Sequence, residues 1–505
     1  MDAHDVVALV PELMLVLAAI VLLLVDPLLP RDGRRGLSWL GVAPCVTAIV
    51  VTWWTRDEVA TYFNGAVVND RFAVYFKILL LAVAIVAMLL SEKHLHLHDR
   101  LLSDYYALVL FTTVGMMVMV AAIDLVTFFV GLELMALSSY ILAGFFRYDS
   151  KSIEASLKYF LTGSFASVFL LLGMALLYGT TGATSYYAIG DAIAAGDAPE
   201  SVMVLAVVTL LAGFAYKVAA APFHNWAPDV YQGSPTPAAA FLSVAPKIAV
   251  FATIIRFLTH MLSQQNDIWA PLFIVIAIGT MLIGATMAIV QTDLKRMLAY
   301  SSIAHVGYLL LALAAEGYAD VSFGKAAILY YLAAYAFMNM GAFGVLVHLA
   351  NRADFDYSLE KVSGIYRRYP WTAGIMTLFM LSLAGIPPTA GFFAKFYLFA
   401  AVVNSGLAWL AVIGVLFSLV SAFYYLRVIV YMYMRDPDTE LEELNGRSVD
   451  LGAGLGLAAL AVVALGIFPG PVLDNAQDAV HKMFTGPQPE AVQEADAAPG
   501  AAVAP

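Results

Sequence analysis

The sequence predicts an all-α polytopic membrane protein, and two observations support this prediction. The chain has 505 residues, of which 62% are hydrophobic and only 12% are charged, whereas soluble domains carry about 25% charged residues. The apolar residues fall in many runs, each close to the length of about 20 residues that an α-helix needs to cross a bilayer. The net charge of −11 is spread over loops and tail, so we expect no nucleic-acid partner.

We expect about fourteen transmembrane helices. Their approximate bounds are 5–28, 37–54, 72–91, 103–121, 123–146, 154–179, 201–222, 236–260, 268–290, 293–314, 322–349, 371–402, 405–434 and 451–470. The first span has an apolar centre like that of a secretory signal. However, the acidic residues Asp2, Asp5 and Glu12 stand where a signal peptide carries basic ones, so we interpret it as a retained span.

The basic residues of the loops give an independent test of the span count. Most of them lie in loops that follow odd-numbered spans, and only Arg56, Arg71, Arg256 and Lys325 lie in loops that follow even-numbered spans. Lysine and arginine are enriched in cytoplasmic loops. The pattern therefore places the odd loops in the cytoplasm and both termini outside, and a wrong count would destroy the alternation.

A weak internal repeat divides the chain. The segment ASLKYFL at 155–161 matches AAILYYL at 326–332, and each half then reaches a proline break, at Pro222 and at Pro387–Pro388. Two blocks of five spans start on opposite sides of the membrane because five is odd, which is the inverted repeat of many transporters. We therefore expect four parts: a three-helix segment at 1–100, repeats at 101–262 and 263–435, and a last span at 436–505. This last part ends in a tail that is disordered from about Gly486.

The proline-rich stretch at 211–251 is the most informative segment. Lys217 and His224 lie around its first break, and Lys247 follows Pro246 in the next span. A lysine at the bilayer centre costs about 2.5–3.5 kcal/mol, and broken backbone at that depth survives only when it is packed in protein or lines a wet cavity. Ionisable groups beside broken helices are typical of an ion path.

Two more lysines, Lys158 in span six and Lys395 in span twelve, are expected deep in the membrane. A single buried lysine is about as often a structural partner of carbonyls or a carboxylate, but four in one bundle favour a pathway. Glu133 is the one acid well inside a span. It is either an ion pair that fixes helix packing or a carboxylate that stabilises the charged form of a nearby lysine.

Histidine and tyrosine side chains extend the candidate path. His224 and His305 titrate near neutral pH and suit proton relay, although a lone buried histidine is more often a satisfied core residue. Tyr300 and Tyr424 are weaker candidates, because tyrosines in spans are commonly packing residues. His94, His96 and His98 alternate along the chain, so on a helix they would not share a face, and we interpret them as solvated loop residues rather than a metal site.

The chain carries no signature of a bound cofactor. It has a lone cysteine, Cys45, and we find no glycine-rich phosphate loop, haem-attachment motif or cysteine framework for a cluster. We expect no metal or cofactor site in this chain, so any redox chemistry linked to it takes place on another subunit.

Three motifs carry a resemblance to a known family: KVAAAPFHNWAPDVYQGSPTP, APKIAVF and LSLAGIPPTAGFFAKF. With the span count and the two breaks, they make the chain similar to the antiporter-like proton-pumping subunits of respiratory complex I. Lys395 stands where the M-type subunits generally have glutamate, and the short end after the last span differs from the longer L-type and cation/proton antiporter subunits. The N-type branch fits best.

The resemblance implies roles for six residues on a central hydrophilic axis: Glu133, Lys158, Lys217, His224, Lys247 and Lys395. It implies proton translocation coupled to NADH oxidation and quinone reduction on partner subunits, which would hold NADH, FMN, iron–sulfur clusters and quinone. Protons would enter from the cytoplasm and leave near Lys395. The implied partners are the neighbouring antiporter-like and small membrane-arm subunits and lipid, in the inner (plasma) membrane of a bacterium. Two alternatives stay open: a cation/proton antiporter subunit and a non-conducting membrane scaffold.

Overall fold

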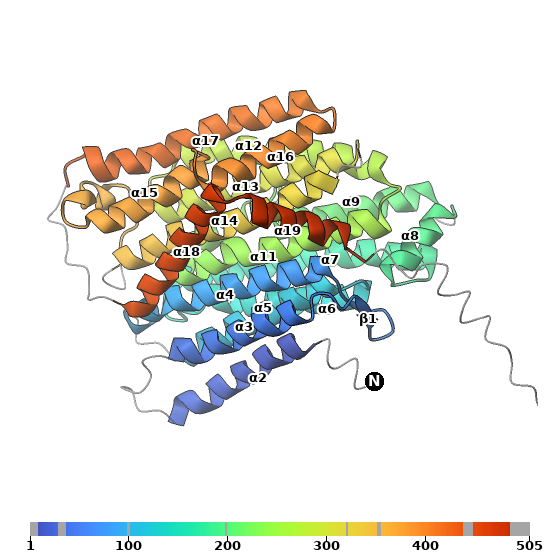
Figure 1. Ribbon diagram of the computed structural model, residues 1–505, viewed down its shortest axis with the longest axis horizontal. Helices are drawn as coiled ribbons and strands as arrows, with labels where there is room; N and C mark the ends of the chain where they lie inside the picture. Colours follow the sequence, from blue (N-terminus) through green and yellow to red (C-terminus); the bar gives the residue numbers. More distant parts are fainter. Residues whose placement is uncertain are drawn as a thin grey trace, which may run out of the picture.

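Helices whose axes lie roughly along one common line make up nearly the whole molecule (Figure 1). The computed structural model describes residues 9–28, 37–97, 102–196, 199–319, 322–350, 355–437 and 448–484. Within these residues, thirteen helices are long and apolar enough to cross a membrane. Two shorter apolar helices, α15 and α16, together occupy the span expected at 371–402. The expected polytopic helical fold is confirmed.

The bounds of the elements follow the predicted spans closely. The N-terminal segment contains α2 (Val10–Val25), η1 (Asp26–Leu28), α3 (Leu37–Trp54), β1 (Ala60–Tyr62), β2 (Val67–Asn69) and α4 (Arg71–Leu97). The first block contains α5 (Leu102–Ala121), α6 (Leu125–Ala143), α7 (Ser150–Thr181), α8 (Tyr186–Ala194), α9 (Glu200–Lys217), α10 (Trp226–Gly233), α11 (Thr236–Arg256) and the π-helical turn η3 (Phe257–Met261). The second block contains α12 (Asn266–Val290), α13 (Leu294–Glu316), α14 (Ser322–Leu349), η4 (Glu360–Val362), η5 (Ile365–Arg367), α15 (Pro370–Ala384), α16 (Ala390–Asn404) and α17 (Ala408–Met434). The chain then forms α18 (Val449–Ile467) and α19 (Gly470–His481).

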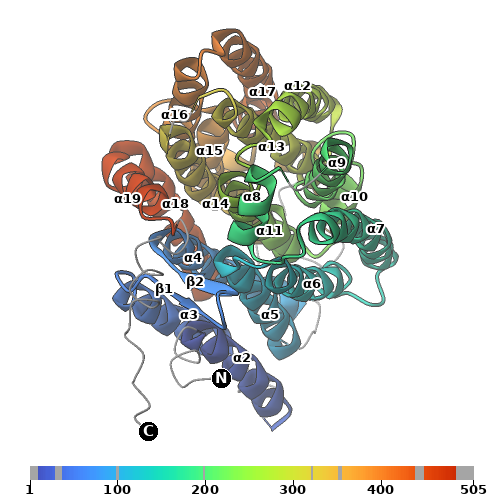
Figure 2. The same ribbon diagram turned by 90° about the vertical axis from the view of Figure 1, so that its right-hand side faces the viewer.

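The most enclosed helices are α11, α13 and α14. Every residue of α11 is buried, and the most apolar stretch of α13 is fully buried as well. Figure 2 looks along the helices and shows α11 and α14 inside a ring of other helices. A helix that is apolar all round belongs in the interior. Lys247 on α11 and His305 on α13 therefore lie on helices that the rest of the protein shields from lipid.

Two spans are broken, at equivalent places in the two blocks. The first break separates α9 from α10 and the second separates α15 from α16. Each break contains a cis peptide bond before proline, at Ala221–Pro222 and at Pro387–Pro388. Both breaks lie in the fourth span of their five-span block, as the predicted repeats require. The domain bounds at 101–262 and 263–435 themselves remain a prediction.

Three small elements at one end of the bundle were not expected. The strands β1 and β2 form an antiparallel hairpin in which Ala60 pairs with Asn69 and Tyr62 with Val67. Phe63, Asn64 and Gly65 all have positive φ, and Asn-Gly is a strong hairpin signal, so the sequence did contain this information. The amphipathic helices α8 and α19 lie at the same end (Figure 2). The predicted disordered tail from Gly486 lies outside the described residues.

Candidate functional site

A serine joins the candidate acid to the first candidate lysine. The hydroxyl of Ser167 on α7 donates to Glu133 Oε1 over 2.7 Å, and Lys217 Nζ donates to the same Ser167 Oγ over 3.2 Å. Ser167 and Lys217 are buried, and Glu133 is half-buried. The structure shows no direct ion pair between the carboxylate and the ammonium, so the hydroxyl bridges two charges of opposite sign.

Local backbone geometry places Lys217 at the end of α9. The last carbonyls of a helix lack partners within it. In this helix Trp226 Nε1 donates to the Tyr216 carbonyl over 3.0 Å, and Ala220 N donates to the Ala215 carbonyl over 2.7 Å. Ala219 has a positive φ of 62°, which ends the helix. The break therefore positions an ammonium in the protein interior with the helix end satisfied by the chain itself.

Lys247 lies near the middle of α11 and is held by α13. Its Nζ donates to the Ser302 carbonyl over 3.4 Å and to the Ser302 hydroxyl. The Tyr335 hydroxyl on α14 lies 2.7 Å from the same Ser302 hydroxyl, within hydrogen-bond distance. The Lys247 ammonium also lies 5.9 Å from the Tyr231 ring centroid, within the range of a cation–π contact. A buried charge is thus surrounded by hydroxyl groups and an aromatic face, and no carboxylate of the described residues forms an ion pair with it.

His305 uses both of its ring nitrogens. Nδ1 lies 2.6 Å from Tyr331 Oη and Nε2 lies 3.0 Å from Tyr425 Oη. Ser301 shares a hydrogen bond with the same Tyr425 hydroxyl. Because both nitrogens face hydroxyl groups that can donate or accept, either tautomer finds a partner. The ring is fully enclosed by the protein.

Lys395 on α16 reaches across the second break to the end of α15. Its Nζ donates to the Leu383 carbonyl over 3.0 Å, to the Ala384 carbonyl over 2.9 Å and to Ser418 Oγ over 2.9 Å. These carbonyls are at a helix C-terminus, where partners are missing and the helix dipole is negative. The break therefore supplies the charge complement that this buried ammonium needs.

Aromatic rings together with hydroxyl groups connect Lys247, His305 and Lys395 through the interior. Tyr335 contacts Ser302 beside Lys247, and its ring centroid is 5.2 Å from that of His305. On the other side, the Tyr308 ring is 5.8 Å from His305 and 5.4 Å from Lys395 Nζ. We call Lys247, Ser302, Tyr335, His305, Tyr425, Tyr308 and Lys395 the central polar chain.

The link from Lys217 to Lys247 is aromatic rather than polar. Tyr216 stacks on Trp226 at 5.4 Å, Trp226 meets Tyr231 at 5.9 Å, and Tyr231 faces Lys247. Among the described residues, no hydrogen bond joins the Glu133–Ser167–Lys217 group to the central polar chain. The aromatic rings of Tyr216, Trp226 and Tyr231 therefore lie between these two groups.

Lys158 is not buried, so the expectation that it lies deep is wrong. Its side chain is 44% exposed and pairs with Glu154 at 2.7 Å and Asp229 at 2.8 Å. Asp229 also binds Arg296 at 2.7 Å. The physical reason is the orientation of α7. The first turns of this helix direct the Lys158 side chain to the protein surface, where the carboxylates of Glu154 and Asp229 pair with it. Lys158 therefore ties α7 to α10 outside the central polar chain.

The remaining candidates divide between the break, the surface and the interior. His224 is half-buried in the first break, and its Nδ1 has no hydrogen-bond partner among the described residues. Tyr300 lies under the Arg296 guanidinium, 5.9 Å away, and does not join the central polar chain. Tyr424 is fully buried, with its ring 4.4 Å from that of Tyr425. Of His224, Tyr300 and Tyr424, only Tyr424 therefore lies against the central polar chain.

The interpretation of the histidine triplet as loop residues is also wrong in part. The helix α4 continues through His94 and His96, and His94 is buried with its ring stacked at 5.7 Å on Phe146. His98 lies outside the described residues. In the part of the chain that the structure describes, no group of three or more His, Cys, Asp or Glu side chains is placed to hold a metal ion.

Sequence reasoning missed several hydroxyl residues of the candidate site. Ser167, Tyr331, Tyr425 and Ser418 each contact a candidate side chain, and Tyr335 contacts Ser302 beside Lys247. Each is a common residue in an apolar span, and its partner is far away in sequence. The sequence offered only a weak signal for them, namely hydroxyl residues inside the same apolar spans that carry or neighbour the ionisable residues.

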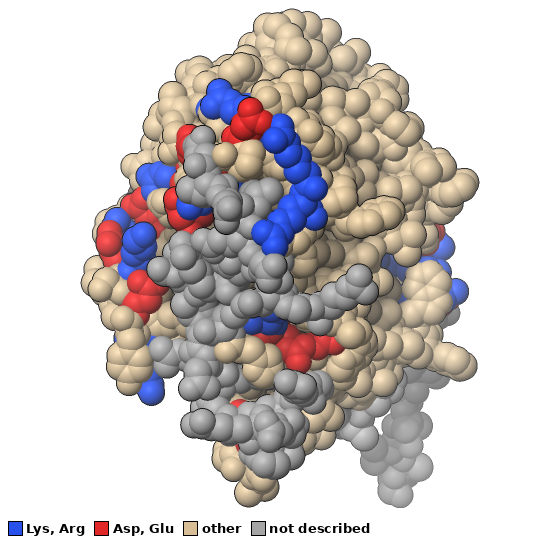
Figure 3. Space-filling view, turned by 90° about the vertical axis from the view of Figure 1, so that its left-hand side faces the viewer, with Lys and Arg blue, Asp and Glu red and all other residues tan. Residues whose placement is uncertain are grey.

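A polar cavity of about 640 Å³ lies at the end of the bundle that carries the odd-numbered loops. Asp149, Asp293 and Asp356 line it together with Lys295, whose buried Nζ donates to the Ser234 carbonyl over 2.7 Å. Figure 3 looks at this end of the molecule and shows acidic and basic side chains gathered over part of it. The cavity reaches the turn between α10 and α11, and α11 leads inward to Lys247.

Comparisons with known proteins show the family of the chain. Residues 122–421 match the family model described as the membrane part of NADH:quinone oxidoreductase and Mrp antiporters. The NADH-quinone oxidoreductase subunit N of Trichlorobacter lovleyi is 43% identical over 474 residues, covering 93% of this chain and 96% of that protein. A chain of respiratory complex I from Thermus thermophilus superimposes with a TM-score of 0.76 at 31% identity, over 92% of this chain and 98% of that one.

The fold extends to a solved structure of lower sequence identity. A chain of the Mrp complex from a Dietzia species superimposes with a TM-score of 0.80 at 21% identity, covering 95% of this chain and 97% of that one; this likeness shows the fold alone. The family match spans more than half of the chain, and the bacterial relative matches it nearly end to end. The chain therefore belongs to the antiporter-like membrane subunits of NADH-quinone oxidoreductase, in the branch of subunit N.

Proposed function

We propose that this chain is a proton-translocating module of complex I whose proton path runs from Lys217 through the central polar chain to Lys395. NADH oxidation and quinone reduction take place on other subunits, which hold FMN, the iron–sulfur clusters and the quinone. The observation that supports this path most strongly is the continuity between Lys247, His305 and Lys395. Tyr335 contacts both Ser302, beside Lys247, and the His305 ring, and the Tyr308 ring lies between His305 and Lys395.

Proton uptake starts at the polar cavity beside Lys295. The excess of basic residues in the odd-numbered loops places this end in the cytoplasm of a bacterium, with the plasma membrane around the bundle and both termini outside. From Thr236 at the cavity, Ser243 is seven residues along α11, about 10 Å at 1.5 Å per residue. Asn339 donates to Ser243 Oγ over 2.7 Å, and Tyr335 donates to the Ser243 carbonyl over 3.3 Å. Hydroxyl and amide groups thus approach Lys247 from the cavity side.

Ser167 allows the Glu133–Ser167–Lys217 group to act as a switch. Its hydroxyl stabilises the Glu133 carboxylate by donating to it and the Lys217 ammonium by accepting from it. A charge change on a neighbouring subunit that neutralises or withdraws Glu133 removes this support. Burial then disfavours the ammonium, and the proton of Lys217 moves toward Lys247.

Release requires a gate at Lys395. Each proton moved against the membrane potential costs about 2.3 kcal/mol per 100 mV, so an ungated exit would leak protons back. The Lys395 ammonium is held by two carbonyls of α15 across the break. Moving α15 relative to α16 breaks both hydrogen bonds at once and lets the proton leave.

The experiment uses the assembled complex in sealed proteoliposomes, with NADH-driven proton uptake and sodium flux followed together. Lys395→Ala is expected to lower the number of protons moved per NADH oxidised, while Arg367→Ala, at an exposed position, leaves it unchanged. Sodium-dependent transport in a preparation without NADH dehydrogenase activity would instead support a cation/proton antiporter subunit. Unchanged proton transport in assembled Lys217→Ala and Lys395→Ala complexes would support a non-conducting scaffold.

A further inference from the structure

An apolar groove of about 500 Å³ opens on the side of the bundle formed by α4, α14, α18 and α19. Its body is lined by side chains such as Ile78, Leu79, Phe337 and Leu465. Tyr335 and the other central residues do not line it, so the groove is separate from the proton path. Its size is within the usual range for a ligand site, about 300–1,000 Å³.

One end of the groove lies at the level where two spans, α3 and α4, meet the membrane surface and where the short helix α19 ends. Trp53 is at the end of α3, Arg71 begins α4, and Asp478 is on α19, which follows α18 directly. Tryptophan is enriched at membrane–water interfaces. The alternation of basic loops places this end on the outer side of the membrane. The groove therefore runs from the outer headgroup level into the apolar region.

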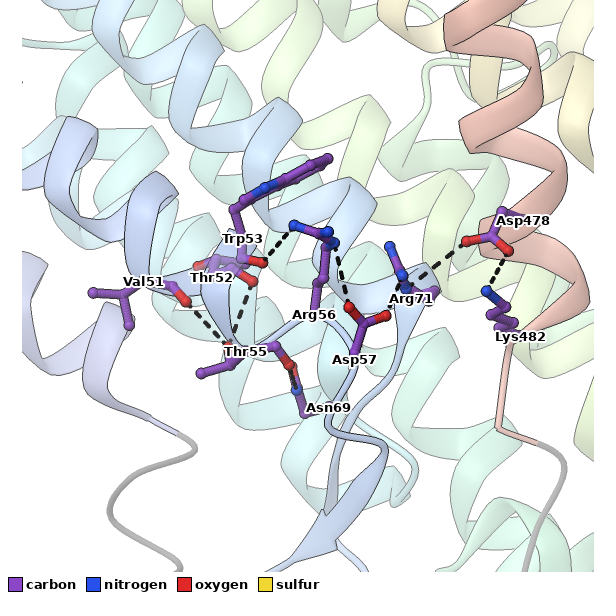
Figure 4. Close-up of polar contacts among 10 residues, drawn as sticks. All are labelled: Val51, Thr52, Trp53, Thr55, Arg56, Asp57, Asn69, Arg71, Asp478 and Lys482. Atoms are coloured by element: carbon purple, nitrogen blue, oxygen red, sulfur yellow. Dashed lines mark hydrogen bonds and ion pairs between the residues drawn. The ribbon is translucent and has the colours of Figure 1, made fainter.

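The polar end carries an excess positive charge. Figure 4 shows Arg56 and Arg71 sharing Asp57, and Arg71 and Lys482 sharing Asp478. Three cations thus meet two carboxylates. The Arg71–Asp478 contact is 3.8 Å long, beyond hydrogen-bond distance. Arg71 Nε has no hydrogen-bond partner among the described residues. The cluster of these five residues therefore carries a net positive charge, which favours a negative group with oxygen acceptors.

We propose that the groove binds a phospholipid, with an acyl chain against α4 and α18 and the phosphate at Arg71. An apolar body with a single cationic end matches the two parts of this molecule. A helix of another subunit could fill the apolar body, but it would bring no phosphate to Arg71, so the charge of the polar end favours the lipid.

The test is photo-crosslinking in the purified, assembled complex. The probe is a phosphatidylglycerol with a diazirine in one acyl chain, and adducts are mapped by peptide mass spectrometry. The wild-type complex is expected to carry adducts on α4 and α18. Ala464→Phe, at an exposed groove position, is expected to lower their yield at least fivefold, and Arg71→Gln at least threefold. Leu419→Phe on the exposed face of α17 is the matched control and should leave the yield unchanged.

Two further measurements keep the result decisive. Ala82→Leu fills the groove from the opposite wall, so it replaces Ala464→Phe if that variant does not assemble. A phosphate-free probe, a diacylglycerol with the same diazirine, should crosslink at the lower yield of Arg71→Gln. Equal yields in wild type and in the filled variants would overturn the proposal. Crosslinks between another subunit and Trp53 or Phe468 would also overturn the proposal, because they would show that a protein segment occupies the groove.

Discussion

Ser167 Oγ lies between Glu133 and Lys217, 2.7 Å from the carboxylate oxygen and 3.2 Å from the ammonium nitrogen. A direct ion pair would hold both charges firmly together, and breaking a buried pair costs about 3–5 kcal/mol. A hydroxyl bridge holds them more weakly, because the serine can rotate and change its partners. This arrangement suits a site that must gain and lose charge during each cycle.

Ser167→Ala is expected to weaken the coupling between redox chemistry and proton transport. A hydrogen bond to a charged group contributes about 1.5–3 kcal/mol, so the step that depends on it should slow by roughly tenfold or more. Quinone-linked NADH oxidation and proton uptake should both fall in proteoliposomes. Ser156→Ala is the control on the same helix, because its hydroxyl only binds the Tyr140 carbonyl. Equal behaviour of the two variants would rule out the bridge.

Tyr425→Phe should impair proton transport more than Tyr424→Phe. The Tyr425 hydroxyl contacts His305 and Ser301, so its removal leaves one imidazole nitrogen without that partner. The Tyr424 hydroxyl makes no contact with His305, whose two ring nitrogens face Tyr331 and Tyr425, and its ring keeps its packing as phenylalanine. The measurement is the proton-to-NADH ratio of each assembled variant. A larger defect in Tyr424→Phe would contradict the predicted order.

Gly385→Ala should disturb the exit at Lys395. Gly385 ends α15 with a φ of 88°, and an added Cβ would lie 3.0 Å from Lys395 Cδ. The left-handed conformation costs a residue with a side chain about 1–2 kcal/mol, so the turn and the ammonium must both shift. Gly374→Ala on the same helix meets nothing within 4 Å and serves as control. We expect slower NADH-driven proton release only in Gly385→Ala, measured with both variants at equal assembly.

Asp70→Asn should destabilise the subunit strongly. Asp70 and Arg256 form a fully buried pair through two hydrogen bonds of 2.7 and 2.9 Å. Removing one partner leaves an uncompensated charge, at a cost of about 3–5 kcal/mol. The exposed pair of Arg367 and Asp436 is the comparison, since surface pairs contribute about 0–1 kcal/mol. The thermal unfolding midpoint of the purified complex should fall for Asp70→Asn and stay within error for Asp436→Asn.

The sequence predicted the spans well because bilayer thickness imposes a strong constraint on the length of each apolar run. It also predicted the buried ionisable residues Lys217, Lys247, His305 and Lys395, since a charged group inside a span is costly and needs a reason. It could not predict the exposure of Lys158. In a span that is apolar on all sides, periodicity does not tell which face meets protein, and only the packing of α7 against α10 decides this.

The contacts of the site were beyond sequence reasoning for a related cause. Ser167 lies 34 residues from Glu133 and 50 from Lys217, and serine in an apolar helix is unremarkable by itself. Tyr335 and Tyr425 gain their roles only because α14 and α17 pack beside α13. The hairpin at Ala60–Asn69 is different, because Asn64–Gly65 gave a local signal that a search for membrane spans overlooks.

The most direct test of the proton path is the number of protons moved per NADH oxidised by a complex carrying Lys247→Ala. Lys247 is the centre of the path, and among the described residues it hydrogen-bonds only to Ser302, so the variant removes the titratable group together with few hydrogen bonds. We predict a complex that assembles and oxidises NADH at its peripheral site but moves fewer protons per NADH. A fully assembled Lys247→Ala complex with the wild-type ratio would contradict the proposed path.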